Sequence, residues 1–93
     1  MEALDRIERK LKMLRKWLII LISEDKENYE KHLYQESYDL VLRQIDINLE
    51  DIDEARVDHA RGVDISPRVR QLKQEFNFST NIYRDLVKLF NDP

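Results

Sequence analysis

The residues of this 93-residue sequence that could do chemistry are two histidines and nineteen aspartates and glutamates. Helical bundles hold pairs of metal ions with a Glu-x-x-His motif from each of two helices and further inward-facing glutamates. Arg56 precedes His59 by three residues and Tyr29 precedes His32, so neither histidine completes that motif. His32 and Glu36 have the spacing of two ligands on one helical face, but no further ligands accompany them. We therefore expect no metal site.

Nucleophilic catalysis and phosphate binding find equally little support. The sequence has no cysteine, which excludes thiolate catalysis, Cys-ligated zinc and disulfides. Phosphate-binding loops need glycines, and the single glycine, Gly62, stands where a helix is expected to end. Two histidines on one helix give no base placed beside a nucleophile. We expect no catalytic residue and no cofactor.

Charge is unevenly distributed along the sequence, although the net charge is only −3. Residues 6–16 carry six basic side chains against Glu8, and residues 46–58 carry six acidic ones against Arg56. A basic amphipathic helix can bind a membrane surface or RNA, which is one alternative function. RNA binding would need aromatic side chains among the basic ones, and Trp17 lies on the apolar side. We expect ion pairs instead, so neither nucleic acid nor a membrane is the expected partner. The acidic block is expected to face the cations that start the last helix: Arg68, Arg70 and Lys73.

Three helices are expected to position these side chains. Residues 2–22 repeat apolar side chains at alternating spacings of three and four, which predicts an amphipathic helix. Residues 29–61 contain no proline and repeat similarly, which predicts one long helix ended by Gly62. Ser66 and Pro67 supply a capping hydroxyl and a first-turn proline for a third helix over 67–91. The alternatives are an uninterrupted helix through residues 23–28 and a kink at residues 77–81. The expected core positions are Leu4, Ile7, Leu11, Leu14, Leu18 and Leu21, then Tyr38, Leu42, Ile45, Leu49 and Ile52, then Val69, Leu72, Phe76, Ser79, Tyr83, Leu86 and Phe90.

The predicted fold class is all-α: one domain over residues 1–93, folded as an antiparallel three-helix bundle with a long central helix and forming a helical dimer. At about 1.5 Å per residue, the helices would be roughly 32, 50 and 36 Å long, so each end of the middle helix would lack one neighbour. Burying a large apolar side chain stabilises a protein by about 1.5–3 kcal/mol. We therefore expect a second copy of the chain to cover the apolar side chains at these ends. The residues expected on these uncovered ends, where they would bind either the second copy or a foreign partner, are Trp17, Ile20, Leu21, Leu33, Ile52, Ala55 and His59.

One family resemblance points to a different function. The chain length, the three unequal helices and the expected dimer are similar to the helical chorismate mutases, and Leu4-Asp5-Arg6-Ile7 resembles the start of their first helix. The resemblance covers the first 22 residues. It implies a small helical enzyme with basic residues on the inner faces of its later helices, and those residues have no clear counterpart here. Such an enzyme is the second alternative function.

The function expected from the sequence is non-catalytic protein–protein interaction. We expect a small regulator, inhibitor, immunity or adaptor protein that acts as a homodimer and binds another protein through a helical surface. The longest apolar run, residues 17–22, is far shorter than a membrane span and lacks the features of a signal peptide. The expected location is therefore the cytoplasm.

Overall fold

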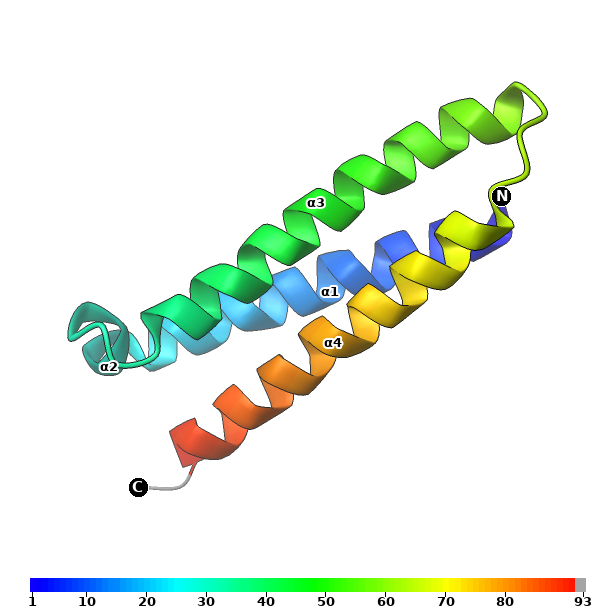
Figure 1. Cartoon of the computed structure of the whole chain (residues 1–93). Helices are drawn as coiled ribbons and strands as arrows, with labels where there is room; N and C mark the ends of the chain where they lie inside the picture. Colours follow the sequence, from blue (N-terminus) through cyan, green and yellow to red (C-terminus); the bar gives the residue numbers. More distant parts are fainter. Residues whose placement is uncertain (92–93) are drawn as a thin grey trace.

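The computed structural model describes residues 1–91, which form four helices and no strand. These helices are α1 (Glu2–Glu24), α2 (Lys26–Glu30), α3 (Gln35–Ala60) and α4 (Ser66–Asn91). The long helices α1, α3 and α4 pack against one another along an elongated molecule of 51 × 18 × 17 Å (Figure 1). The all-α prediction is confirmed.

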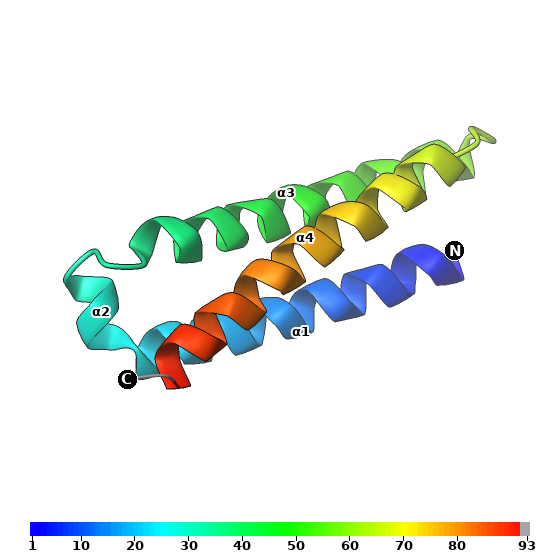
Figure 2. The ribbon, with the colours of Figure 1, turned by 60° about the horizontal axis from the view of Figure 1, so that its bottom comes forward.

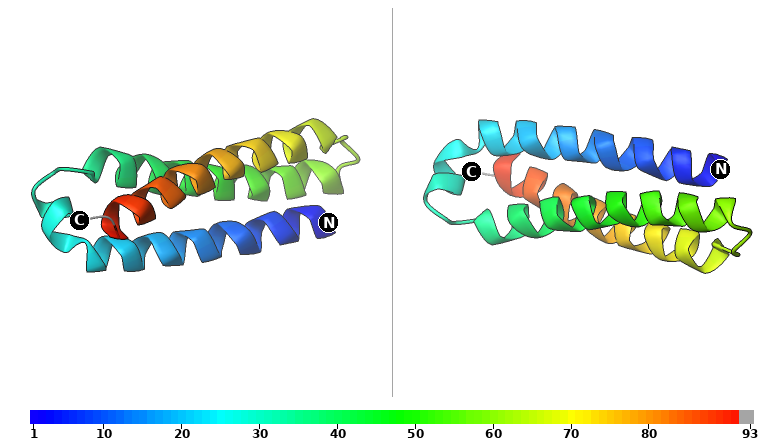
Figure 3. Two further views of the ribbon diagram at one scale, coloured as in Figure 1. Left: turned by 90° about the horizontal axis from the view of Figure 1, so that it is seen from below. Right: turned by 90° about the horizontal axis from the view of Figure 1, so that it is seen from above.

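Contacts between charged side chains show the relative directions of the long helices. Arg56 near the end of α3 contacts Asp5 at the start of α1, whereas Asp46 contacts Arg15. The residue numbers rise on one helix as they fall on the other, so α3 runs antiparallel to α1. Figure 3 shows that α4 lies beside both and runs in the direction of α1, which places its last turns at the same end of the bundle as α2.

The predicted continuous helix over residues 29–61 is wrong. The short helix α2 ends at Glu30, and residues 31–34 form a turn before α3 begins at Gln35. His32 adopts a left-handed conformation with φ of 60°, and the N–H groups of His32 and Leu33 donate to the carbonyls of Tyr29 and Asn28. This pattern is the Schellman motif that ends many helices. Figure 2 shows α2 forming the corner between α1 and α3.

The break at residues 31–34 removes the excess length expected of the middle helix. Helices α1, α3 and α4 contain 23, 26 and 26 residues, which corresponds to about 35–39 Å each. Figure 3 shows α3 flanked by α1 and α4 along most of its length. The expected overhang of a long central helix, on which the predicted dimer depended, is therefore absent from residues 1–91.

The other helix boundaries agree closely with the sequence. Gly62 has φ of 83° and ends α3 with the same Schellman hydrogen bonds that His32 makes after α2. Helix α4 continues through residues 77–81, so the alternative kink is not observed, while the break at Asp25 excludes an uninterrupted helix through residues 23–28. At the start of α4, the Asp64 carboxylate accepts a hydrogen bond from the Ser66 N–H at 3.0 Å. That bond lowers the pKa of Asp64.

The core lies along the axis between the three long helices. All six predicted positions of α1 are buried, as are Val69, Leu72, Ser79 and Leu86 of α4. On α3 the stripe differs from the prediction, because Leu42 and Leu49 lie at the edge of the core while Val41 and Asn48 are fully buried. Phe76 and Tyr83 are also only partly buried, and Phe90 is exposed. The last three side chains leave apolar surface along α4.

Candidate functional site

The structure separates the residues expected at an interface into two groups. Leu21, Ile52 and Ala55 belong to the core within the chain, so the expectation that they lie on uncovered helix ends is wrong. Four residues are exposed: Trp17, Ile20, Leu33 and His59. They do not form one surface, because Trp17 and Ile20 lie on α1, Leu33 in the turn after α2, and His59 in the last turn of α3.

The strongest candidate for a binding site is a groove between α1 and α4. It has a volume of about 310 Å³. Its apolar surface comes from Met13 and Trp17, one turn apart on α1, and from Phe76 and Tyr83, two turns apart on α4. Trp17 is 47% exposed and Met13 51% exposed. The complete lining is Lys10, Met13, Leu14, Trp17, Phe76, Thr80, Tyr83 and Arg84. We refer to this feature as the α1/α4 groove.

Small residues of α4 lie at the level of the α1/α4 groove. Ser79 is fully buried, and the neighbouring Thr80 lines the groove. The Thr80 hydroxyl donates to the carbonyl of Phe76 at 2.9 Å, within its own helix. The O–H donor of Thr80 is therefore satisfied within its own helix.

Two cations, Lys10 and Arg84, lie at the rim of the α1/α4 groove. Within residues 1–91, neither forms an ion pair. Lys10 belongs to the basic block, the six basic side chains of residues 6–16, and three other members of that block do form ion pairs. Those three pairs join Arg6 to Glu2, Lys12 to Glu8, and Arg15 to Asp46. Half of the basic block is therefore neutralised inside the chain, while the groove keeps its positive rim.

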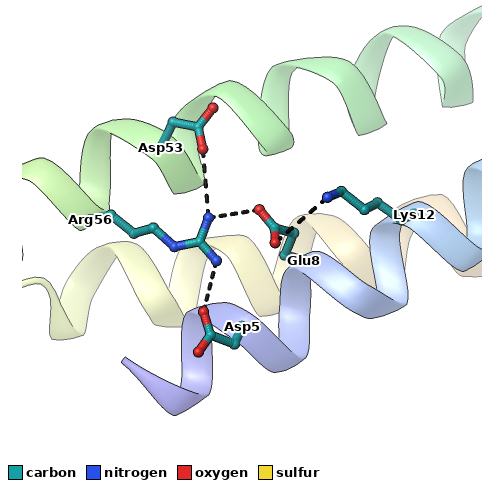
Figure 4. Close-up of polar contacts among 5 residues, drawn as sticks. All are labelled: Asp5, Glu8, Lys12, Asp53 and Arg56. Carbon is teal, nitrogen blue, oxygen red and sulfur yellow. Dashed lines mark hydrogen bonds and ion pairs between the residues drawn. The ribbon is translucent and has the colours of Figure 1, made fainter.

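The densest ion-pair cluster lies between α1 and α3 and is centred on Arg56 (Figure 4). The guanidinium contacts Asp5 and Glu8 at 2.7 Å each and Asp53 at 3.6 Å. Hydrogen bonds from Arg56 lower the pKa values of Asp5 and Glu8, and the same bonds raise that of Arg56. Because each carboxylate is held by a cation, this cluster joins two helices and does not present a free acid or base.

A small acidic hollow lies between α3 and α4, with a volume of about 190 Å³. Burial raises the pKa of Asp51, and the nearby carboxylates of Glu75 and Glu54 raise it further. Arg68 contacts Asp58 at 2.5 Å, which confirms one of the predicted pairs between the acidic block and α4. Across residues 1–91, no three His, Asp or Glu side chains are grouped so that they could hold a metal ion. The remaining lining residues are Gln71 and Leu72.

Two further polar contacts are buried between helices. Asn48, which is fully buried on α3, donates to the Glu75 carboxylate of α4. At the α2 corner, the Tyr38 hydroxyl donates to the Asp25 carboxylate at 2.7 Å, and burial raises the pKa of Tyr38. A phenol with a raised pKa stays protonated at neutral pH and cannot serve there as a base. Both contacts position helices and leave no reactive group free.

Sequence reasoning did not identify the α1/α4 groove, although it expected Trp17 at an interface. Met13 and Trp17 form a second apolar stripe on α1, and that spacing was the available signal. Phe76 and Tyr83 were expected in the core, since they continue the apolar repeat of the last helix. Their partial exposure depends on how α4 is rotated against α1, which no local pattern reveals.

Comparisons with known proteins give no further indication of function. None of the protein families compared matches the chain, and neither the curated proteins nor the solved structures contain a significant match. Each helix within residues 1–91 is too short or too polar to span a lipid bilayer.

Proposed function

We propose that this protein is a small, non-catalytic, cytoplasmic interaction protein that binds another protein in the α1/α4 groove. It would act as a regulator, inhibitor, immunity protein or adaptor. The observation that carries the proposal is the groove itself, where Met13, Trp17, Phe76 and Tyr83 form an apolar channel open to solvent. Partly exposed aromatic side chains in a concave site are typical anchors of protein interfaces.

The alternatives drawn from the sequence have less support. A chorismate-mutase-like enzyme would need charged side chains facing inward, whereas the buried positions of the three long helices in residues 1–91 hold apolar side chains with Asn48 and Ser79. A binder of RNA or lipid through α1 would use the basic block, and half of that block is paired within the chain. These observations favour protein binding.

A display selection tests the proposed groove. A library of short amphipathic helices is selected on the wild-type protein, and the enriched peptides are then measured on two variants. Trp17→Asp places a charge in the groove, while Ile47→Asp changes a side chain of nearly equal exposure, 45%, on α3. We expect the peptides to lose binding to Trp17→Asp and keep it on Ile47→Asp, with circular dichroism verifying both folds. Equal binding to the two variants, or no enrichment on the wild type, would contradict the proposal.

Self-association is a second proposal. Two adjacent apolar side chains of α1 outside the α1/α4 groove, Ile19 and Ile20, are 44% and 45% exposed, and we propose that a second copy covers them. Burying such side chains stabilises an assembly by about 1.5–3 kcal/mol each at most. Sedimentation equilibrium over a concentration series should show a reversible dimer that Ile20→Asp weakens. A monomer at every concentration would contradict it.

A further inference from the structure

The chemistry of the α1/α4 groove defines the class of its partner. We infer that the groove selects an amphipathic helix with acidic residues on both sides of its apolar stripe. The inference rests on the proposed function, because it assumes that the groove binds protein. It adds the shape and the charge of the bound segment, each of which comes from a separate observation.

The shape of the groove fits a helix. Two helices form its walls, and its apolar side chains come from both of them rather than from one raised face. Phe76 and Tyr83 are seven residues apart, or about 10 Å along α4. An amphipathic helix presents anchors at i, i+3 or i+4, and i+7, which cover the same length. A flat bilayer would meet the rims of this channel, whereas a convex helix can reach its floor.

The charge of the groove selects against cations. Lys10 stands on the α1 side and Arg84 on the α4 side, so both rims carry a positive charge. No carboxylate of residues 1–91 lies within ion-pair distance of either side chain. Acidic residues flanking an apolar stripe would meet one cation on each side. Such rim pairs add little raw affinity but decide which partner binds.

The same charges argue against a second copy of the chain in this groove. A two-fold dimer places the same surface patch of each copy against the other. Lys10 and Arg84 of one copy would then approach the cationic rims of its partner, with no acid from the groove to offset them. The proposed dimer, if it uses Ile19 and Ile20, must therefore leave the groove to another protein.

Trp17 makes the inference directly measurable, because it is the only tryptophan of the chain and it lines the groove. Two peptides without aromatic residues share one apolar stripe, and they carry glutamates or lysines at its flanks. The Glu-flanked peptide should shift the Trp17 emission to the blue and saturate, at low salt, with affinity about tenfold or more above that of the Lys-flanked peptide. The double variant Lys10→Glu/Arg84→Glu should reverse this preference.

A matched control separates the groove charges from net charge. Arg43→Glu/Arg61→Glu changes the net charge equally on α3 and after it, and it should leave the peptide preference unchanged. Circular dichroism verifies the fold of both double variants. If the control reverses the preference as well, the effect comes from net charge and the inference is overturned.

The remaining outcomes distinguish the two levels of the proposal. Equal binding of both peptides would overturn the charge selection and leave the protein-binding groove intact. Binding of neither peptide would overturn both. A blue shift with anionic phospholipid vesicles but not with the Glu-flanked peptide would assign the surface to lipid. A blue shift that develops with protein concentration alone would assign the groove to a second copy, and either result would overturn the inference.

Discussion

The Tyr38 hydroxyl donates to the Asp25 carboxylate at 2.7 Å, which joins the first turn of α3 to the residue between α1 and α2. Both side chains are buried, and Asn28 donates to the other carboxylate oxygen at 2.7 Å. The ring of Tyr29 packs edge-on against Tyr38, with centroids 6.0 Å apart. These contacts fold α2 back across the end of the bundle and fix where α3 begins.

Removing this hydroxyl should destabilise the protein. Tyr38→Phe keeps the ring but leaves the buried Asp25 carboxylate without one partner, which should cost about 1–3 kcal/mol in the free energy of unfolding measured with urea. The matched control is Tyr29→Phe, because the Tyr29 hydroxyl makes a longer, 3.2 Å bond to Asp39 in a partly buried position. If Tyr38→Phe lowers the free energy of unfolding no more than Tyr29→Phe does, the buried bond contributes no more to stability than the partly buried one.

Arg56 should make stability depend on pH in the acidic range. The folded-state pKa values of Asp5 and Glu8 lie below their ordinary values of 3.8 and 4.5 because Arg56 bonds both carboxylates. Their contribution to stability is therefore complete above about pH 4.5 and is lost as the pH falls through the lowered values. In Arg56→Gln, the melting temperature should fall less steeply below pH 4.5 than it does in the wild type. Arg6→Gln, which breaks an exposed pair with Glu2, should leave that slope nearly as steep as in the wild type.

Asp51 should have the opposite effect. Burial and neighbouring carboxylates raise its folded-state pKa above 3.8, so the folded state holds the proton more tightly than the unfolded state. The resulting stability is present below pH 3.8 and is lost as the pH rises through the raised value. Asp51→Asn should therefore melt at a higher temperature than the wild type at pH 7, and this advantage should shrink on acidification. Glu50→Gln, an exposed neighbour, is the control, and an equal gain there would refute the role of the hollow.

Ser79 should be replaceable with a gain in stability. Its Oγ is buried and has no hydrogen-bond partner within residues 1–91. An unpaired buried hydroxyl costs about 1–3 kcal/mol, and alanine is also the better helix former. Ser79→Ala should raise the free energy of unfolding by about 1 kcal/mol or more. The exposed Ser23→Ala measures the helix-propensity part alone, so the difference between the two variants reports the hydroxyl.

In each of the two Schellman motifs, glycine is the favoured residue at the position with positive φ. His32 has φ of 60°, where glycine is preferred, and Gly62 has φ of 83° in open space, since a Cβ added there would meet no atom within 4 Å. His32→Gly should stabilise the protein and Gly62→Ala should destabilise it, each by about 1 kcal/mol, because a side chain is strained at positive φ. Equal melting temperatures for Gly62→Ala and the wild type would contradict the prediction that alanine is strained at this position. Urea unfolding of the two single variants measures both effects.

Much of the fold could be predicted because its signals are local. The apolar repeat of α1, the start of α4 near Pro67 and the glycine that ends α3 each occupy a few consecutive residues. Helix periodicity and left-handed end residues act at that range, so the sequence alone specifies them. The sequence also placed Trp17 among the residues expected at an interface, and Trp17 is exposed on α1.

The break after α2 and the set of exposed residues depend on tertiary contacts. Nothing in residues 29–34 forbids a helix, and the break follows from contacts of Tyr38 and Tyr29 with residues ten or more positions away. With the middle helix shortened, Leu21 and Ile52 enter the core, while Phe76 and Tyr83 open onto the groove. A helical repeat defines which side chains share a face, but burial depends on the length and rotation of the neighbouring helices, which are set by long-range contacts.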